Sequence, residues 1–266
     1  MSTPLAAFRA LDALARQDSV VHRLHPGVGT ALTLLFVVTV SSFPAREVSG
    51  LLPLLLIPVG AAGLAGLPFS LLARQVLRAT PFGLALALPA LFLDRTPVGV
   101  LGPLPLTGGM LVFASVTLRV VLSLSAALVL AATTGVEGIT WALQRFGLPR
   151  ILAIQVLLLH RYLHVLAAEA DRMVRARNLR AFGKGRDLGT WGALVGSLLL
   201  RALARGRRVW GAMQLAGFDG RIRPLRDPVF RRVDAAVGAT LVCALVTVRL
   251  IDLPELLGVW LTRGAP

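Results

Sequence analysis

PRILAIQVLLLHRYLHVLAAEADRMVRARNLRAFGKGRDLGTWGALVGSLLLRALARGRRVWGAMQLAGFDGR, residues 149–221, decides how the rest of the chain is interpreted. This stretch holds 12 arginines in a protein that otherwise consists of long apolar runs. Glu169 and Arg172 are spaced i,i+3 with the acid on the N-terminal side, which is the favourable orientation in a helix. We therefore predict a first helix from about Leu148 to Leu179.

A second helix is predicted by side chains that repeat every three or four residues. Its apolar and basic stripes are formed by Val195, Leu199, Ala202, Gly206, Val209 and Met213, and by Arg201, Arg205 and Arg208. Gly183 and Gly185 separate the two helices, and Gly217 ends the second, because glycine adopts turn and left-handed conformations readily. The second helix thus has an apolar face that should be buried and a basic face that is available to contact a partner.

The composition indicates an integral membrane protein. Of the 266 residues, 56% are hydrophobic and 15% are charged, which is too apolar for an ordinary soluble domain. The net charge is +15, and in a multispanning protein such an excess is typical of basic cytoplasmic loops. The single cysteine excludes an internal disulfide and a site with several thiolate ligands. We expect a multi-pass protein of the cell's inner (plasma) membrane, surrounded by the lipid bilayer.

Five membrane-spanning helices are predicted from the apolar runs. They are Val28–Phe43 or an earlier start at His25–Pro26, Gly50–Leu67 with its interrupting prolines, Pro81–Leu93 or an earlier start within LLARQVLRAT, Met110–Thr133, and Val233–Leu250. The basic segments before residue 26, at 68–80 and at 137–232 fall on one side when these spans alternate. By the positive-inside rule that side, with the N-terminus, is cytoplasmic. The Pro- and Gly-rich loop 94–109 then lies outside, and the apolar tail 253–261 is either a partial sixth helix or an interfacial one.

Arg119 lies near the middle of the fourth predicted span. A guanidinium at such a depth costs about 2.5 to 3.5 kcal/mol on insertion scales, so it should face protein or water rather than lipid. Two interpretations are open. Arg119 either snorkels or pairs with a carbonyl at a helix end, or it contacts a partner subunit in the membrane.

Motifs for catalysis and for nucleotide binding are missing from the sequence. There is no GxxxxGK[ST] phosphate-binding loop and no GxSxG nucleophile motif. His160 and His164 have the i,i+4 spacing of helical metal ligands, but Arg161 beside them opposes a bound cation. We expect no enzyme activity, no cofactor and no metal site in this chain.

Several segments resemble a known transporter family. They are HRLHPGVGTALTLLFVVTVSS (22–42), TTGVEGITWALQRFGLPR (133–150) and RYLHVLAAEADRM (161–173), besides the basic stretch. Together they resemble the T component of energy-coupling-factor (ECF) transporters, in particular its cobalt-type, CbiQ-like branch. The similarity keeps its register over most of the chain.

The family carries two short Ala-Arg-Gly-like signatures, each ending a long helix. The resemblance places ATPase contacts at Arg175, Ala176, Arg177, Asn178, Arg180, Leu215, Ala216 and Gly217. The chain departs from the family at Asn178, where glycine is usual, and at Ala216, where arginine is usual. This sequence therefore retains one signature arginine, Arg177, where the family has two.

The resemblance implies an all-α fold with about five transmembrane helices and a cytoplasmic pair of long crossed coupling helices. Residues 1–135 would form a four-helix transmembrane part, 136–224 the coupling helices, and 225–266 a last span and tail. In the family, two ATP-binding cassette ATPase subunits bind and hydrolyse ATP, and a membrane S component binds the substrate. The T component is a non-catalytic subunit that transmits motion between them.

The branch resembled implies cobalt as the substrate. A nickel importer and a shared T component of vitamin transporters are alternatives of the same class. A more distant alternative is a membrane-anchored basic protein that binds anionic lipid or nucleic acid. Trp191 and Trp210 do not interleave with the arginines as a base-stacking platform would, so nucleic acid is not an expected partner.

Overall fold

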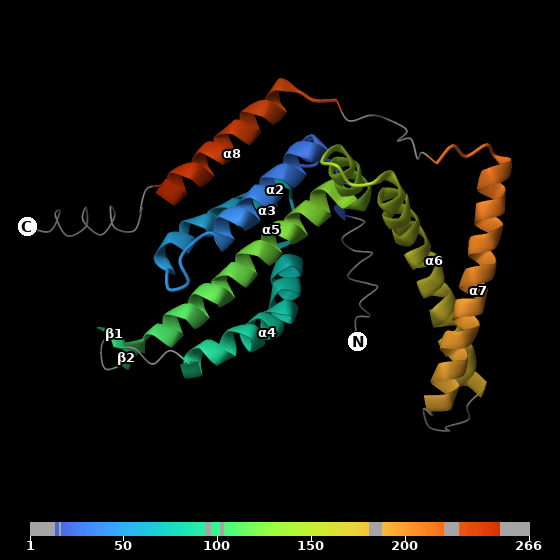
Figure 1. The fold of residues 1–266 in the computed structure, drawn as a ribbon, viewed down its shortest axis with the longest axis horizontal. Coiled ribbons are helices and arrows are strands. Elements are labelled where there is room, and N and C mark those ends of the chain that lie inside the picture. The colour runs from blue at the N-terminus through green and yellow to red at the C-terminus, as the bar shows by residue number, and fades with distance from the viewer. Residues whose placement is uncertain are drawn as a thin grey trace, which may run out of the picture. The chain divides into compact units, whose positions relative to one another are not determined.

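The computed structural model describes residues 14–15, 17–93, 97–101, 104–180, 188–220 and 229–250. These residues are mainly helical (Figure 1), which confirms the predicted all-α class. They divide into two compact units. The unit that holds all five predicted spans, called the spanning unit after them, lies within Ala10–Ala142 and Pro228–Pro266, and the two-helix unit lies within Leu143–Asp227. The predictions for residues 1–13, for Gly183 and Gly185, and for the tail 253–261 fall outside the described residues.

Helix α2 (Pro26–Ser41) begins the spanning unit. Pro26 occupies the first helical position, where its missing N–H has no helical partner to lose. The side chain of His25 caps this end, because its Nδ1 accepts a hydrogen bond from the Gly27 N–H at 3.2 Å. The helix takes the earlier of the two starts predicted for the first span and ends two residues before its predicted end.

The second predicted span is broken into short helices. Two 3₁₀ turns, η1 (Ser49–Leu51) and η2 (Pro53–Leu55), precede helix α3 (Leu56–Leu64). Pro58 lies in the first turn of α3, where a backbone N–H has no intrahelical acceptor. The break predicted at Pro53 is therefore confirmed, whereas Pro58 continues the helix instead of interrupting it. After the end of α3, Gly66 with φ 66° allows the Leu67 N–H to bond to the Ala62 carbonyl.

Helix α4 (Phe69–Leu93) takes the earlier of the two starts predicted for the third span. Residues 81–93 alone would reach only about 20 Å, whereas the 25 residues of α4 reach about 37 Å at 1.5 Å per residue. Arg74, from the predicted basic segment 68–80, therefore lies on this helix. At Gly83 the helix approaches α5 closely, since a Cβ there would lie 2.8 Å from Cγ1 of Val120.

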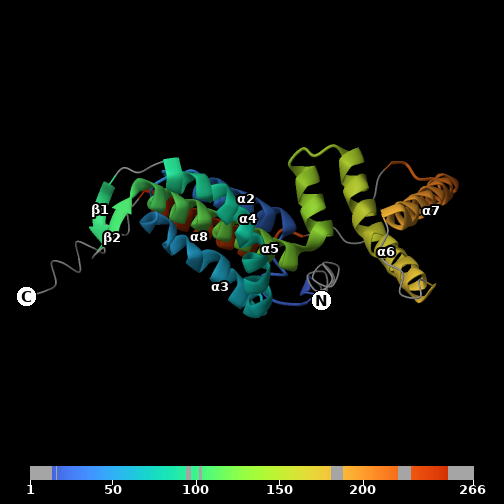
Figure 2. The same cartoon turned by 90° about the horizontal axis from the view of Figure 1, so that it is seen from below.

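The predicted outer loop 94–109 contains a small antiparallel hairpin. Strand β1 (Pro97–Leu101) pairs with strand β2 (Leu104–Thr107), with Pro97 opposite Thr107 and Leu101 opposite Leu104. The hairpin leads directly into α5 and lies beyond the start of that helix (Figure 2). Apolar periodicity did not predict it, because prolines and glycines hide the strand pattern.

Helix α5 (Gly108–Arg145) is the central element of the spanning unit. Its Leu122 is fully buried in a cluster with residues of α2, of the two 3₁₀ turns and of α8. This cluster comprises Phe36, Val40, Phe43, Leu51, Leu54, Leu122 and Leu245. Further along, Val129 and Ala132 pack with Ala62, Ala65 and Leu67 at the end of α3. Gly135, with φ 67° and ψ 167°, then interrupts the helix and kinks it.

Helix α8 (Arg232–Leu250) agrees with the predicted fifth span and packs parallel to α2 (Figure 1). The N-terminal ends are joined by Asp234, which accepts a hydrogen bond from the His25 N–H at 3.2 Å. At the other ends, the Arg249 guanidinium lies 5.1 Å from the centre of the Phe43 ring. The two helices are therefore held together at both ends.

Two of the described helices are long and apolar enough to cross a membrane by length and composition. They are α5 and α6 (Arg150–Arg180), with mean hydropathies of 2.0 and 1.7 in 18-residue windows. Pro26–Ser41 and Ser49–Leu64 are shorter apolar helices. Helix α6 was predicted to be cytoplasmic because of its arginines, yet these follow a first half as apolar as a span. The membrane character is confirmed, and the count of five spans stays a prediction.

Candidate functional site

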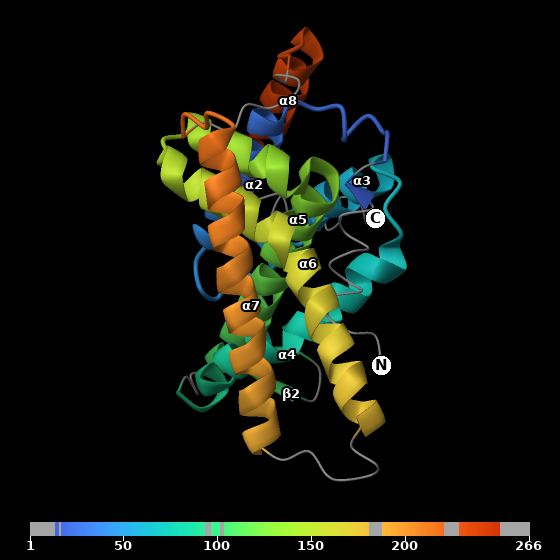
Figure 3. The same ribbon diagram turned by 90° about the vertical axis from the view of Figure 1, so that its right-hand side faces the viewer.

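The two-helix unit consists of α6 and α7 (Leu188–Leu215), which run antiparallel. The helices draw apart toward the lower ends in Figure 3 and toward the upper ends in Figure 1, so they approach each other mainly in between. At 1.5 Å per residue, the 31 residues of α6 and the 28 residues of α7 give helices about 45 Å long. Both helices were predicted, and α6 agrees with its predicted range to within two residues.

One carboxylate ties the two helices together. Glu169 of α6 accepts a hydrogen bond from Arg201 Nη1 of α7 at 2.5 Å, and its other oxygen pairs with Arg172 of α6. The Glu169–Arg172 spacing signalled a local pair in the sequence. Arg201 was identified only as part of a basic stripe, because no sequence spacing predicts a partner 32 residues away. The tie fixes which parts of α6 and α7 face each other.

The first signature lies in the last turns of α6. Arg177 and Arg180 occupy the C-terminal turn, where cations favourably oppose the negative end of the helix dipole. Arg177 is half-buried and donates from Nη1 to Oδ1 of Asn178 at 3.4 Å. Arg175, Ala176 and Arg180 are exposed. The end of α6 thus presents a cluster of cations on a regular helical backbone.

The second signature is the C-terminal cap of α7. Gly217 has φ 72°, and its N–H bonds to the Gln214 carbonyl at 3.0 Å. The Phe218 N–H bonds to the Met213 carbonyl at 3.0 Å, which completes a Schellman motif. The glycine of this signature is therefore explained by backbone geometry. Leu215 and Ala216 are exposed just before it, and Leu215 is 92% exposed.

The structure does not bring the two signatures together. Because α6 and α7 are antiparallel, the C-terminal end of α6 lies beside the N-terminal end of α7, at the bottom of Figure 3. The cap at Gly217 lies at the opposite end of the pair. The predicted site is therefore two separate surfaces, about one helix length apart.

An apolar hollow of about 780 Å³ lies between the first half of α6 and the second half of α7. Leu152, Leu159 and Tyr162 line it from α6, and Val209 and Met213 from α7. Part of the predicted apolar stripe of α7 thus faces α6 across a space instead of packing in a core. The structure places Val195 and Leu199 of the same stripe on the surface, 63% and 58% exposed. Arg205 joins the lining and brings the basic stripe to its edge.

Arg119 of α5 binds the chain that follows the end of α2. Its Nη2 donates to the Phe43 carbonyl at 3.0 Å and to the Pro44 carbonyl at 2.6 Å. Arg249 of α8 donates to the neighbouring Ser42 carbonyl at 3.5 Å. This geometry matches the interpretation in which Arg119 pairs with carbonyls at a helix end. It leaves the proposed contact with a partner subunit untested.

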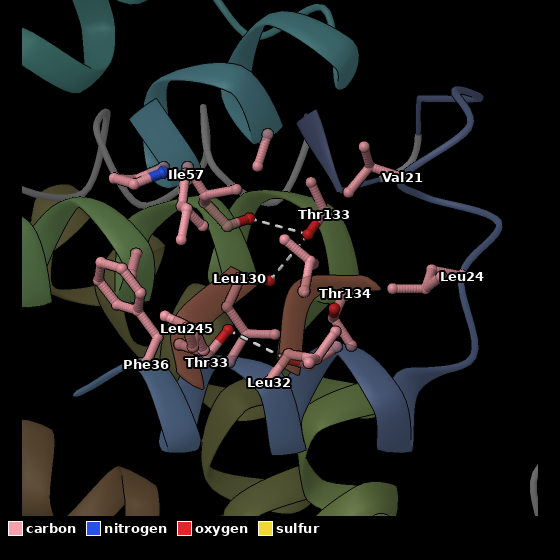
Figure 4. A pocket seen from close by; sticks show the side chains of 16 residues that line it. Val21, Leu24, Leu32, Thr33, Phe36, Ile57, Leu130, Thr133, Thr134 and Leu245 are labelled. Carbon is pink, nitrogen blue, oxygen red and sulfur yellow. Dashed lines mark hydrogen bonds between the residues drawn. The ribbon is translucent and has the colours of Figure 1, made fainter. Parts of the chain in front are cut away.

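A smaller apolar cavity of about 110 Å³ lies inside the spanning unit, between α2, α3, α5 and α8 (Figure 4). Phe36, Ile57 and Leu245 are among its lining side chains. The Thr33 and Thr133 hydroxyls in its wall donate to carbonyls of their own helices, at 3.0 and 2.8 Å. The cavity therefore presents mainly hydrocarbon to whatever enters it.

The His160 and His164 rings lie edge to face, with centroids 5.4 Å apart. Within the described part of the chain, no group of three or more His, Cys, Asp or Glu side chains is placed to hold a metal ion. The pair packs on one side of α6, as the i,i+4 spacing predicts.

Comparison with known proteins adds one finding. The family model of the cobalt transport protein CbiQ matches residues 17–225. This range includes α2 to α7 and both signatures, and it ends before α8. None of the curated proteins compared with the chain matches it.

Proposed function

Because the chain belongs to the CbiQ cobalt transport protein family, we propose that it is the coupling (T) component of an ECF-type importer. The family describes a component of a cobalt transporter rather than an enzyme. In the proposed complex, two ATPase subunits bind the cytoplasmic two-helix unit and a membrane S component binds the substrate. The chain would cross the inner membrane several times with its N-terminus in the cytoplasm.

The observation that carries this proposal is the separation of the two signatures. A single ATPase contact would need one surface, whereas α6 and α7 present their signatures at opposite ends of helices about 45 Å long. Two ATPase subunits, one at each end, fit this arrangement. Arginine suits such a contact because its planar fork pairs with carboxylates bidentately.

The apolar hollow between the helices supports a role for a second kind of partner. Leu159 is 67% exposed and Trp210 is 57% exposed along it. Exposed apolar surface of this extent commonly marks a protein or membrane contact. We assign the basic helix ends to the ATPases and the apolar flank to the membrane partner. Closure of the ATPases would then move both helix ends and shift what rests on the flank.

The proposal is tested by reversing the charge of the signature arginine. Removing one partner of a desolvated charge pair costs about 2 to 5 kcal/mol, so Arg177→Glu should abolish retention of the ATPase subunits. Arg207→Glu, an equal charge change at an exposed position of α7, is the matched control. Ala216→Arg, which restores the residue usual in the family, should be tolerated or should tighten the complex.

The measurement is a pull-down of the ATPase subunits with each variant in the same detergent, followed by ATP hydrolysis. Insertion of every variant is checked by its yield from membranes. If Arg177→Glu retains and stimulates the ATPases like the parent, Arg177 is not the coupling contact. Retention of nucleic acid instead of ATPase subunits would support the distant alternative.

A further inference from the structure

A buried carboxylate joins the starts of two helices in the spanning unit. Asp234, 3% exposed, accepts the His25 N–H through Oδ1 at 3.2 Å and the Arg231 N–H through Oδ2 at 2.7 Å. A buried carboxylate is costly unless it is hydrogen-bonded. Here it is satisfied by backbone donors at the N-terminal ends of α2 and α8, where helix dipoles favour a negative charge.

The side chain of His25 makes two ring contacts at the same place. Its imidazole lies edge to face with Trp141 of α5, with centroids 5.2 Å apart and the planes at 74°. It also lies edge to face with Phe230, at 5.5 Å and 69°. Such pairs add specific orientation to apolar contact. The Nδ1 atom accepts the Gly27 N–H at 3.2 Å, which fixes the ring against the start of α2.

These contacts coincide with the two points where the chain passes between the units. The chain leaves the spanning unit after Ala142 and returns to it at Pro228. Trp141 is the penultimate residue before the exit, and Phe230 is the third residue after the return. Residues of the spanning unit close to both crossing points, Trp141 and Phe230, therefore contact the one imidazole of His25.

We propose that His25 and Asp234 form the junction through which displacement of the two-helix unit reaches α2 and α8. The inference rests on the proposed function, since it assumes that the two-helix unit transmits motion. His25 and Asp234 are positioning residues in this scheme. The ring of His25 takes up movement of Trp141 and Phe230, and Asp234 couples that movement to two helices at once.

The packing around the junction suits a mechanical link. Residues of α5 run close to α2 just after the kink at Gly135, because a Cβ on Gly138 would lie 3.4 Å from Pro26 Cβ. A Cβ on Gly27 would lie 3.2 Å from the His25 ring and 3.9 Å from Trp141. Small residues thus bring α2 and α5 into near contact, and closely packed elements transmit displacement instead of absorbing it.

The spanning unit provides its own control for this proposal. α2 and α8 are tied a second time at their opposite ends, where Arg249 contacts the Phe43 ring and the Ser42 carbonyl. That tie joins the same helices but lies far along them from residues 141 and 230. Loss of either tie loosens the α2–α8 pair. Only loss of the His25–Asp234 contact should uncouple the α2–α8 pair from residues 141 and 230, which lie next to the two crossings into the two-helix unit.

The experiment uses the complete transporter in proteoliposomes and measures ATP hydrolysis and Co²⁺ uptake for each variant. His25→Ala should keep the ATPase subunits and hydrolysis, while Co²⁺ moved per ATP falls about tenfold, within the usual range of coupling between sites. His25→Phe keeps a ring for Trp141 and Phe230 and should recover most of the loss. Asp234→Asn replaces one acceptor by a donor, so one backbone N–H loses its partner and the ratio should fall too.

Arg249→Leu is the matched control and should lower the melting temperature without changing the ratio of uptake to hydrolysis. The inference is overturned if His25→Ala transports Co²⁺ per ATP like the parent. It is also overturned if Arg249→Leu lowers the ratio as much as His25→Ala does. Failure of the parent chain to retain any ATPase would instead reject the proposed function. If Asp234→Asn does not insert into the membrane, the test rests on the ratio of Co²⁺ uptake to ATP hydrolysis in His25→Ala and His25→Phe.

Discussion

The spanning unit and the two-helix unit use apolar side chains in opposite ways. In the spanning unit, Leu51, Leu54 and Leu122 are fully buried, and α5 contacts the elements around it through two clusters. In the two-helix unit, Ala153 is the one buried residue of α6, and α7 has none. The first unit completes its own core, whereas the second leaves apolar surface for something else to cover.

Exposure therefore has a different meaning in each unit. Exposed apolar residues of the spanning unit, such as Val38 and Leu56, suit contact with lipid. In the second half of α7 they alternate with arginines, which are costly to place in lipid hydrocarbon. A helix that is apolar on one flank and basic on the other is better suited to contact with protein at the membrane border than to contact with lipid. The contrast predicts that substitutions in the two units affect different measurements.

The largest effect is expected from the core of the spanning unit. Leu122→Ala removes a fully buried side chain from the centre of α5 and should lower the free energy of unfolding by about 2 to 5 kcal/mol. Leu199→Ala on α7, where the leucine is 58% exposed, is the matched control and should change stability little. Thermal unfolding of both variants in one detergent makes the comparison.

The control variant also sharpens the comparison. Leu199→Ala should weaken assembly with partner subunits more than it weakens the isolated chain. Equal losses of stability from Leu122→Ala and Leu199→Ala would mean that the two-helix unit has a core of its own. That result would remove the argument that its apolar surface awaits a partner.

A smaller effect is expected at Arg119, which belongs to the spanning unit although it is charged. Arg119→Leu removes a charged donor from the Phe43 and Pro44 carbonyls. Hydrogen bonds to charged groups are worth about 1.5 to 3 kcal/mol, and the insertion cost that leucine relieves offsets part of this loss. We expect correct insertion with a modestly lower melting temperature, and Arg119→Lys should lose less.

The measurement for Arg119 is thermal unfolding of the purified chain beside retention of its membrane partner. An unchanged melting temperature with weakened retention would show that the arginine serves the partner instead. That outcome would restore the second interpretation given by the sequence.

Much of the fold could be predicted from the sequence because apolar runs and helix-ending residues are local signals. The limits of α6 and α8, the break before Pro53 and the stop at Gly217 all follow from a few neighbouring residues. The early start of α4 was harder, since basic side chains continue its helix outside the apolar run. The small β-hairpin between α4 and α5 was not predicted.

The contacts that define the candidate sites could be predicted less well, because they join residues distant in the chain. His25 and Asp234 are 209 residues apart, and the sequence indicated His25 only as a possible start of the first span and Asp234 not at all. An acid at the third position of α8, close to a histidine-proline start of α2, is a weak signal for helix capping only. The signatures were located by resemblance, whereas their placement at opposite ends needed the antiparallel packing of α6 and α7.

The smallest effect on stability is expected at the tie between α6 and α7. Glu169 is 17% exposed at its side chain, but Arg201 is 63% exposed, so water screens the pair and its loss should cost little. Its role is geometric, since it is the described ion pair that sets α6 against α7. Glu169→Gln and Arg201→Gln, alone and together, form a double-mutant cycle in which the pair contributes only the coupling term. Spin labels at Leu159 and Trp210, across the apolar hollow, should show a broader distance distribution in each single variant and no further broadening in the double variant. Additive broadening would mean that each side chain acts on its own, and the tie would then not hold the two helices in register.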